Sequence, residues 1–412
     1  MPKRIVLAYS GGLDTSVIIK WLIDRYGAEI IALTIDVGQG KGLDEIKARA
    51  LDIGAKEALV VDAKDTFVRY FVFPALRAGA LYEGQYPLAT ALSRPLIAKL
   101  LVDAAREHGA DAIAHGCTGK GNDQVRFDVA TAALAPELQV LAPVREWELK
   151  TREAEIEYAQ RHGIPVPVTK ASPYSTDENL WGRSIEAGAL EDPWLEPPAD
   201  VYAWTKSLGQ APDTPVYKEI QFERGIPVAL DGDPVDGVGL IAQLNDIAGE
   251  HGIGRIDHVE NRLVGIKSRE IYEAPAATVL LKAHKALEGL TLSKDQIRLK
   301  DRIAADYADL IYNGLWFTAN HQDIAAYVHS TQRHVSGTIR VRLHKGTCTV
   351  VGRQSPKSLY SFQLATYDQG DQFDQSAAVG FIQIWGLPVR VQAKAQLLTQ
   401  EEGPLYIAAP EG

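Results

Sequence analysis

Short β-rich runs alternate with amphipathic helical stretches through the first third of the chain. The strand candidates are Ile5–Ala8, Ile30–Val37, Ala58–Val61, Ala112–Ala114 and Val140–Val144. The helical stretches between and after them are Thr15–Tyr26, Leu43–Ile53, Ser93–His108, Asp123–Leu134 and Thr151–His162. Strands that are apolar on both faces and joined by helical crossovers are buried in a parallel sheet with helices on both sides. We therefore expect an α/β fold with a doubly wound parallel sheet, which binds ligands beyond the carboxyl ends of its strands.

The second part of the chain has a different pattern. Residues 172–198 are rich in Pro, Ser and Gly, and we expect an ordered connecting region that carries functional loops. Alternation in Val216–Phe222 and Thr338–Leu343 then predicts antiparallel strands, mixed with helices at Gly239–Glu250, Ala277–Leu287 and Ile303–Tyr312. We predict a nucleotide-binding domain at residues 1–168, an α+β domain at 169–370, and a C-terminal segment at 371–412 that packs on another subunit.

Charge and cysteine content exclude several classes of protein. The 412 residues contain 43 Lys and Arg against 53 Asp and Glu, a net charge of −10, which disfavours broad binding to nucleic acid or to anionic membranes. Cys117 and Cys348 form no CxxC zinc motif and no disulfide framework, and the apolar runs are too short to span a membrane. The N-terminus leads into a strand without a signal-peptide apolar region, so we expect a cytoplasmic protein.

The most informative segment is Ala8-Tyr9-Ser10-Gly11-Gly12-Leu13-Asp14-Thr15-Ser16, between the first predicted strand and helix. Its glycines allow a tight turn whose N–H groups converge, and the helix start adds a positive partial charge, which together suit a pyrophosphate. The segment has neither the lysine of GxxxxGK[ST] nor the third glycine of GxGxxG. A plain strand–turn–helix junction capped by Ser10 or Asp14 is the alternative.

The loop resembles the SGGxDS loop of the N-type ATP pyrophosphatases, which cleave ATP to AMP and pyrophosphate. Further strings resemble the argininosuccinate synthase family in order and spacing, from Leu7 to about Tyr360. These strings are Tyr82–Tyr86, Ser93–Pro95, His115–Phe127, Glu191–Trp194, Val259–Arg262, Lys267–Arg269 and Gly352–Arg353. GMP synthetase, asparagine synthetase, tRNA-thiolating enzymes and a non-catalytic adenine-nucleotide sensor are the rival interpretations. Glutamine-dependent asparagine synthetase needs an N-terminal Cys, but Pro2 follows the initiator here, and the thiolating enzymes commonly use Cys pairs and a basic surface that this chain lacks. A sensor would explain Ser10–Ser16 but not the strings around Thr118–Arg126 and Ser175–Ser184.

The resemblance implies an arginine-biosynthetic and urea-cycle ligase that uses ATP and Mg²⁺ and assembles as a homotetramer. Its reaction joins citrulline to L-aspartate and yields argininosuccinate, AMP and pyrophosphate through a citrullyl-adenylate. Adenylation supplies the leaving group that the poorly electrophilic ureido carbon lacks, and positioned donors and Mg²⁺ stabilise the departing pyrophosphate.

The resemblance also assigns roles to individual residues. The whole loop from Ala8 to Ser16 is expected to bind ATP, together with Ile35 and Gly116. Thr118, Asn122 and Asp123 are expected to hold aspartate. Citrulline is assigned to Tyr86, Thr90, Ala91, Asn122, Arg126, Ser175, Ser184, Glu260 and Tyr272. Catalytic roles fall to Ser10, Asp14 and Asp123, and no residue is assigned as a metal ligand. Lys120 is a further candidate cation for phosphate or carboxylate.

Each of these side chains also has an ordinary structural interpretation. Arg126 can be a surface charge, Glu260 can simply pair with Arg262, and Tyr86 and Tyr272 can be core residues. Helical spacing places Asn122, Asp123 and Arg126 on one face of a helix, which supports the functional interpretation.

Three positions depart from the family pattern. Ala91 stands where the family usually has a serine that contacts citrulline, and Thr90 is the candidate to replace that hydroxyl. Cys117 replaces a small residue and is interpreted as buried packing, not as a nucleophile. Pro388 interrupts a C-terminal helix.

Overall fold

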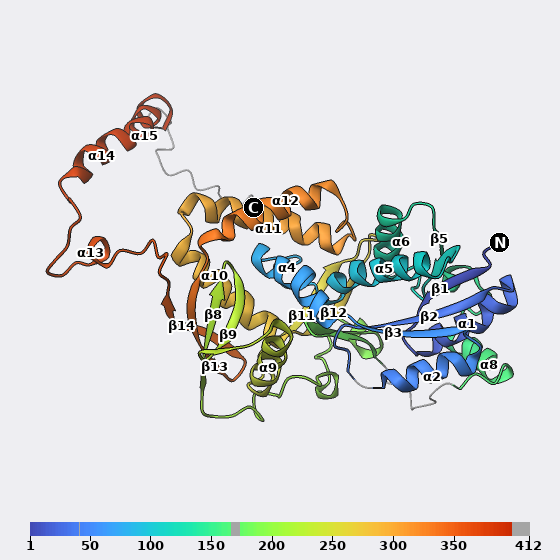
Figure 1. The fold of residues 1–412 in the computed structure, drawn as a ribbon. Helices are drawn as coiled ribbons and strands as arrows, with labels where there is room; N and C mark the ends of the chain where they lie inside the picture. Colours follow the sequence, from blue (N-terminus) through green and yellow to red (C-terminus); the bar gives the residue numbers. More distant parts are fainter. Residues whose placement is uncertain (41, 166–173, 398–412) are drawn as a thin grey trace, which may run out of the picture. The chain divides into compact units, whose positions relative to one another are not determined.

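The computed structural model describes residues 1–40, 42–165 and 174–397. They belong to two compact units, residues 1–358 and residues 359–412 (Figure 1). The predicted domain boundary between residues 168 and 169 lies outside the described residues, and the boundary between 370 and 371 stays a prediction.

Five parallel strands form the sheet of the N-terminal half, in the order β3-β2-β1-β4-β5. They are β1 (Arg4–Ala8), β2 (Glu29–Asp36), β3 (Glu57–Asp62), β4 (Ala112–Ala114) and β5 (Gln139–Leu141). The predicted doubly wound α/β domain is thereby confirmed, with its switch point between β1 and β4. The last predicted strand is wrong beyond Leu141, because Pro143 occupies the first turn of the short helix α7 (Pro143–Glu146).

The helices around this sheet follow the predicted order. They are α1 (Leu13–Tyr26), α2 (Leu43–Ile53), α5 (Ala89–Glu107), α6 (Asp123–Leu134) and α8 (Arg152–Arg161). Helix α5 begins at Ala89, four residues before the predicted start at Ser93. The predicted start is wrong because the helix contains Pro95 in its interior and not in its first turn. Residues 64–78, for which the pattern indicates no element, form α3 (Lys64–Phe67), the π-helix η1 (Val68–Val72) and α4 (Phe73–Ala78).

Two antiparallel sheets and four long helices build the second half, which confirms its α+β character. One sheet has the order β10-β9-β8-β13-β14: β8 (Val216–Glu223), β9 (Ile226–Leu230), β10 (Asp233–Pro234), β13 (Gly337–His344) and β14 (Thr347–Gln354). The other has the order β11-β12-β7-β6: β6 (Ser175–Asn179), β7 (Gly182–Glu186), β11 (Arg255–Asn261) and β12 (Lys267–Glu273). The helices are α9 (Gly237–Glu250), α10 (Pro275–Thr291), α11 (Lys294–Tyr312) and α12 (Ala319–Thr331), with short 3-10 turns η2 (Gly188–Glu191), η3 (Ala199–Val201) and η4 (Gln332–His334).

The expectation of connecting loops after residue 172 is therefore partly wrong. Residues 166–173 lie outside the described part of the chain, but β6 and β7 form a hairpin that pairs through β7 with β12. Polar residues at alternate positions of these strands resemble loop composition, and this concealed the hairpin in the sequence.

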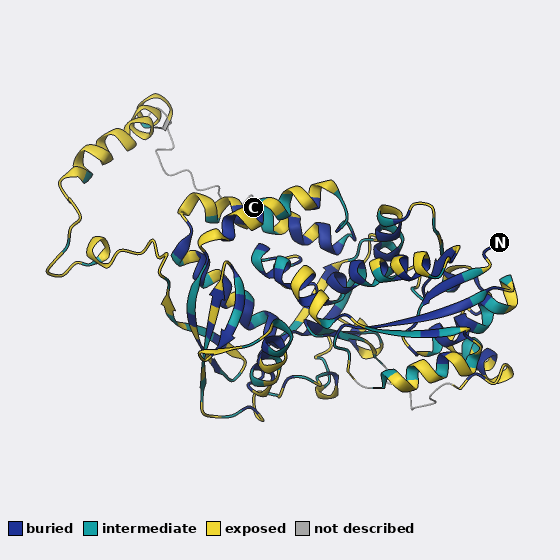
Figure 2. Cartoon of the chain, in the orientation of Figure 1, coloured by how far each residue is buried: buried dark blue, intermediate teal, exposed yellow. Residues whose placement is uncertain are grey.

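Alternation along the parallel strands distributes side chains between two cores. Ile5 and Leu7 of β1 belong to the core that includes α1, whereas Val6 belongs to a larger core that continues to Val279 and Leu280 of α10. Figure 2 shows the central strands as buried and the outer helix faces as exposed. Because one core joins the parallel sheet to the second half, the elements around the site form one compact unit.

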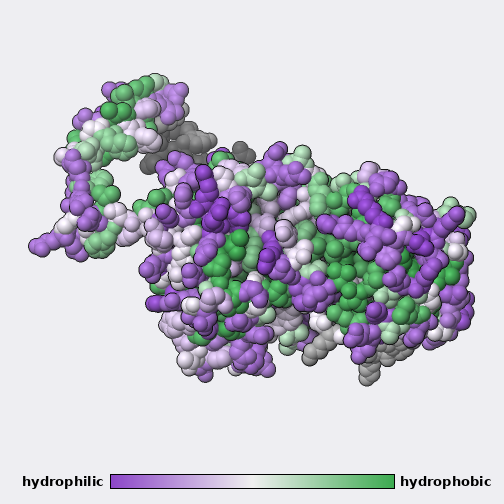
Figure 3. All heavy atoms as spheres, in the orientation of Figure 1, coloured by the Kyte–Doolittle hydropathy of each residue, from purple (hydrophilic) through white to green (hydrophobic). Residues whose placement is uncertain are grey.

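The second unit contains α13 (Phe362–Ala365), α14 (Ala377–Trp385), α15 (Leu387–Gln392) and the π-helix η5 (Ala393–Leu397). Large apolar side chains such as Phe381, Ile384 and Trp385 are 61%, 76% and 75% exposed, and hydrophobic residues gather on the surface of this unit (Figure 3). The helical run breaks at Gly386, and Pro388 lies in the first turn of α15. Across the described stretches of the chain, no helix is long and apolar enough to cross a membrane.

Candidate active site

The loop between β1 and α1 presents uncapped helix amides to a cavity. Gly12 is the N-cap residue of α1, and no side chain caps the helix, so the first-turn N–H groups have no intrahelical partner. Gly11 has φ +77°, and a Cβ there would lie 2.8 Å from Cγ1 of Ile46, so the turn requires glycine. The hydroxyls of Ser10 and Thr15 lie 3.1 Å apart beside these amides. The alternative interpretation of a side-chain-capped junction does not describe this loop.

Members of the predicted ATP-binding set divide into lining and supporting residues. The cavity beside the loop is lined by Ala8, Ser10, Gly12, Leu13, Asp14, Thr15 and Gly116 of that set. Tyr9 and Ser16 are buried, with their hydroxyls 3.1 Å apart, and support the loop from behind. Gly11 is held by Arg49, whose Nη1 donates to its carbonyl at 2.6 Å. The Ile35 side chain lies in the core and does not line this cavity.

Helix α8 brings two charged residues to the loop that the sequence analysis missed. Arg152 lines the cavity, and the Glu155 side chain lies against that of Asp14. Partial burial, with a further contribution from Asp14, raises the pKa of Glu155 to about 8. One oxygen of Glu155, Oε2, is buried and has no hydrogen-bond partner among the described residues.

A second cavity, of about 390 Å³, adjoins the first, and Ser10, Asp14, Gly116, Cys117 and Ser175 line both. One wall is a face of the sheet β11-β12-β7-β6, because Ser184 pairs with both Asp177 and Tyr272, and Ser175 pairs with Glu186. Residues two apart on a strand share a face. This polar face therefore contributes Ser175, Asp177, Ser184, Glu186, Glu260, Arg262, Glu270 and Tyr272 to the lining.

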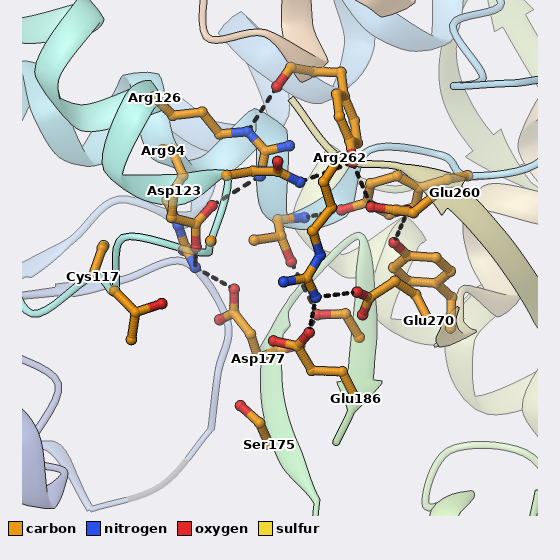
Figure 4. Close-up of a pocket in the computed structure, with 18 of the residues that line it drawn as sticks. Arg94, Cys117, Asp123, Arg126, Ser175, Asp177, Glu186, Glu260, Arg262 and Glu270 are labelled. Carbon is orange, nitrogen blue, oxygen red and sulfur yellow. Dashed lines mark hydrogen bonds and ion pairs between the residues drawn. The ribbon is translucent and has the colours of Figure 1, made fainter. Parts of the chain in front are cut away.

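The start of α6 forms the opposite wall, as the helical spacing predicts. Nη1 of Arg126 donates to Asp123 at 2.8 Å and its Nε donates to the Tyr312 carbonyl at 2.9 Å, while the buried Nη2 has no partner in the described part of the chain. Arg94 of α5 donates to Asp123 at 2.7 Å and also to Asp177 (Figure 4). Burial alone raises the pKa of Asp123, but Arg94 and Arg126 overcome this effect and hold it at about 2.

Glu260 is held by two tyrosines and does not pair with Arg262. The hydroxyl of Tyr272 donates to Glu260 Oε2 at 2.5 Å, and the hydroxyl of Tyr312 donates to Oε1. Tyr272 in turn stacks on Tyr86, with ring centroids 4.1 Å apart. The carboxylate of Glu260 is thus buried but oriented at the cavity wall.

Arg262 joins two carboxylates at the far side of the cavity. Its Nη2 donates to Glu270 at 2.7 Å and to Glu186 (Figure 4). Burial, followed by the nearby charge of Glu186, raises the pKa of Glu270 to about 8.

Nearly all of the predicted substrate-binding residues meet in this cavity. Its lining includes Tyr86, Thr90, Thr118, Asn122, Asp123, Arg126, Ser175, Ser184, Glu260 and Tyr272. Ala91 is fully buried in the core, whereas the Thr90 hydroxyl lies at the cavity, 3.2 Å from that of Ser184. Lys120 is exposed and is not part of the lining.

Cys117 is half-buried and lines both cavities, so the expected burial is only partly correct. Burial, and then the nearby carboxylate of Asp123, raise the pKa of its thiol well above the usual value. The sulfur therefore stays protonated, in agreement with the prediction that it is no nucleophile.

The cavity lining also contains residues that were not predicted from the sequence, Asp177, Glu186, Glu270 and Tyr312, and two arginines for which no role was predicted, Arg94 and Arg262. A usable signal exists for the strand residues: polar side chains alternate in Ser175-x-Asp177, Ser184-x-Glu186 and Glu260-x-Arg262. Such alternation normally marks a solvent-facing side of an antiparallel sheet, so it does not by itself reveal a cavity.

Comparisons with known proteins cover both halves of the chain. Residues 4–165 match the arginosuccinate synthase N-terminal HUP domain, and residues 174–392 match the arginosuccinate synthase C-terminal domain. The argininosuccinate synthase of Dehalococcoides mccartyi is 59% identical over 402 residues, covering 98% of this chain and 99% of the relative. That of Gloeobacter violaceus is 58% identical, covering 96% and 99%, and that of Rubrobacter xylanophilus is 60% identical, covering 94% of each.

Proposed function

The chain belongs to the argininosuccinate synthase family, a family of ligases that join citrulline to aspartate at the expense of ATP, and we propose how its two adjoining cavities divide that reaction. ATP occupies the cavity at the β1–α1 loop, and the two amino acids occupy the cavity between α6 and the polar sheet face. In this proposal the α-phosphate meets citrulline beside the residues that line both cavities.

The β1–α1 loop holds the pyrophosphate end of ATP. Uncapped amides at the start of α1 and the hydroxyls of Ser10 and Thr15 supply the donors. Arg152 supplies a positive charge that the loop itself lacks. Ile35 contacts the adenine of ATP through its backbone only, because its side chain is in the core.

The carboxylates of Asp14 and Glu155 are the side chains that would bind Mg²⁺. Magnesium is typically held by one or two carboxylates together with substrate phosphates. Glu155 offers a buried oxygen without a partner in the described residues, next to Asp14 and to the pyrophosphate loop. A Mg²⁺ ion held there would supply positive charge against the leaving pyrophosphate. No cluster of three or more ligating side chains occurs in residues 1–40, 42–165 and 174–397, so this site needs oxygens from ATP.

The single observation that carries the citrulline assignment is the free donor of Arg126. Its buried Nη2 has no acceptor within the described residues, and an unpaired buried donor is costly unless a ligand satisfies it. The Glu260 carboxylate lines the same cavity. Arg126 therefore binds the α-carboxylate of citrulline, Glu260 binds the α-ammonium, and Tyr86, Thr90, Ser175 and Ser184 line the space along the side chain.

Aspartate binds at the start of α6, where Thr118, Asn122 and Asp123 line the cavity. Asp123 is held ionised, with a pKa of about 2, so it attracts the substrate ammonium but is too weak a base to remove a proton from it at neutral pH. Its role is to orient the amine toward the ureido carbon.

The chemistry takes two displacements. The ureido oxygen of citrulline attacks the α-phosphorus of ATP, the bond to the bridging oxygen breaks, and pyrophosphate leaves. The deprotonated aspartate amine then attacks the ureido carbon, the C–O bond to phosphate breaks, and AMP departs. The site acts mainly by aligning the three substrates and stabilising developing charge.

Citrulline recognition is tested with Arg126→Lys and Glu260→Gln. Both variants are expected to raise the KM for citrulline at least roughly tenfold, because each removes a charged hydrogen bond. The KM for ATP is expected to stay near the wild-type value. The control Arg69→Ala, which removes an exposed arginine, is expected to leave both KM values unchanged. An unchanged citrulline KM in both variants contradicts the assignment.

We also propose a cytoplasmic homotetramer in which the second unit covers neighbouring subunits. Its helices expose apolar side chains, and burying such surface in an assembly is favourable. The two cysteines are free thiols, in keeping with a reducing compartment. Deleting the residues after Ser376 is expected to lower the mass measured by light scattering, and an unchanged mass contradicts the proposal.

A further inference from the structure

Tyr312, the last residue of α11, contacts three residues of the proposed substrate site at once. Its hydroxyl accepts a hydrogen bond from Asn122 Nδ2 at 2.8 Å and donates one to Glu260. Its carbonyl accepts from Arg126 Nε at 2.9 Å. The side chain is completely buried, yet it reaches the wall of the cavity.

The ring and the following turn fix this residue in place. The ring stacks on Tyr82 with centroids 3.5 Å apart and planes 5° from parallel, and the Arg126 guanidinium lies 4.8 Å from its centre. Gly314, with φ +75°, follows two residues later, and a Cβ there would lie 2.8 Å from the Cα of Arg126. The end of α11 therefore packs directly against α6, at a distance that only glycine permits.

The hydroxyl determines the orientation of two side chains. Because Asn122 Nδ2 donates to Tyr312, its Oδ1 faces the Leu263 N–H, from which it accepts at 2.9 Å. The second N–H of that amide remains for a substrate carboxylate. Because Tyr312 and Tyr272 each donate to one oxygen of Glu260, the carboxylate plane is fixed with its remaining lone pairs available to an ammonium.

We propose that Tyr312 is a positioning residue that sets the Asn122 amide and the Glu260 carboxylate for the two amino-acid substrates. The inference rests on the proposed function for the assignment of Glu260 to citrulline and of Asn122 to both substrates. Tyr312 acts through these neighbours and takes no part in the bonds that form or break.

Tyr312→Phe removes the hydroxyl and retains the stacked ring, and Tyr307→Phe is its matched control. Tyr307 lies on the same helix and is also completely buried, but its hydroxyl has no hydrogen-bond partner in the described part of the chain. We expect Tyr312→Phe to raise the KM for citrulline and for aspartate roughly tenfold each, the effect of losing hydrogen bonds at a charged group. The KM for ATP should stay close to that of Tyr307→Phe, whereas the thermal midpoint should fall below that of Tyr307→Phe, because only Tyr312→Phe removes hydrogen bonds to buried groups.

A double-mutant cycle separates positioning from general loosening. If Tyr312 acts through Glu260, adding Tyr312→Phe to Glu260→Gln raises the citrulline KM by no more than about twofold over Glu260→Gln alone. The inference is overturned if the effects of Tyr312→Phe and Glu260→Gln on the citrulline KM multiply fully in the double variant. It is also overturned if Tyr312→Phe has the same citrulline and aspartate KM values as Tyr307→Phe, or if its KM for ATP rises as much as those for the amino acids. The proposed function fails on a different result, namely that the wild-type protein forms no argininosuccinate. In that case the affinity for citrulline is measured by calorimetry for Tyr312→Phe and Tyr307→Phe. Equal affinities of these two variants overturn the inference about Tyr312.

Discussion

Arg94 lies between Asp123 and Asp177, with its Nη2 2.7 Å from Asp123 Oδ2. One cation from α5 thus joins the start of α6 to β6, across the cavity. Arg94 and Arg126 keep the Asp123 carboxylate ionised and restrict its rotation. If Asp123 binds the substrate ammonium as we propose, the carboxylate is already oriented before the ligand enters.

Replacing Arg94 by Gln should destabilise the protein and weaken aspartate binding together. Loss of its charged hydrogen bonds is expected to cost about 2 kcal/mol of the free energy of unfolding at pH 7. The pKa of Asp123 lies below its usual value in the folded state, so this stabilisation exists above the ordinary pKa and is lost as pH falls toward about 2. Urea unfolding at pH 7 and pH 3 should therefore show a smaller difference from wild type at pH 3. Lys99→Ala, which breaks an exposed ion pair on the same helix, is the control and should cost less than about 1 kcal/mol. A pH-independent difference contradicts this explanation.

Asp123→Ala separates the two halves of the reaction. Citrulline-dependent adenylation should persist, because Asp123 is assigned to aspartate. The apparent KM for aspartate should rise by roughly tenfold or more, since a charged contact is lost. Steady-state kinetics with each substrate varied in turn measures both effects, and an unaltered aspartate KM removes Asp123 from this role.

Glu155→Gln should change how stability depends on pH. The pKa of Glu155 is raised to about 8 in the folded state, so the folded protein binds a proton more tightly than the unfolded chain. The free energy of unfolding of the wild type is therefore expected to fall as pH rises from about 4.5 to 8. In Glu155→Gln this fall should be much smaller, because the titrating carboxyl group is gone. Denaturant unfolding at pH 5 and pH 9 measures the difference. Glu153→Gln, an exposed position on the same helix, should behave like wild type.

The same substitution also tests the proposed magnesium site. Glu155→Gln should raise the Mg²⁺ concentration needed for half-maximal activity, because one of two carboxylate ligands is lost. If Glu155→Gln and Glu153→Gln have the same pH dependence of stability and the same Mg²⁺ requirement, the proposed role of Glu155 in binding Mg²⁺ is wrong.

Gly11→Ala should damage ATP binding more than an equivalent change elsewhere. Both Gly11 and Gly27 have positive φ, but an added Cβ meets Ile46 only at Gly11, whereas at Gly27 it meets nothing within 4 Å. Gly27→Ala should therefore cost about 1 kcal/mol in backbone strain and leave the KM for ATP unchanged. Gly11→Ala should cost more stability and raise the KM for ATP. Equal ATP KM values for the two variants contradict the role of the loop.

Much of the nucleotide-binding half was predictable from local pattern. The bounds of α2 and α6 agree with the predictions at both ends, and β1 to β4 agree within one residue. These elements have strong apolar periodicity and clear ends, such as Gly27 and Gly54 in left-handed conformation. The strand–turn–helix geometry of the loop was predictable for the same reason, because the string from Ser10 to Ser16 is contiguous.

The amino-acid cavity was predictable only in part, because it depends on pairing between distant segments. Tyr312 looks in sequence like the end of an amphipathic helix, and only packing of α11 against α6 brings it to Asn122 and Glu260. Glu186 and Glu270 become neighbours through their shared partner Arg262. Sequence indicates that such residues are polar, whereas strand register determines which of them meet.

The most direct test of the account is release of AMP and pyrophosphate from Mg·ATP by the purified protein, with citrulline and aspartate added separately and together. The account predicts that AMP forms only when both amino acids are present, and that mass spectrometry then detects argininosuccinate in equal amount. AMP release with neither amino acid, or only with a different acceptor, contradicts the proposed division of the two cavities.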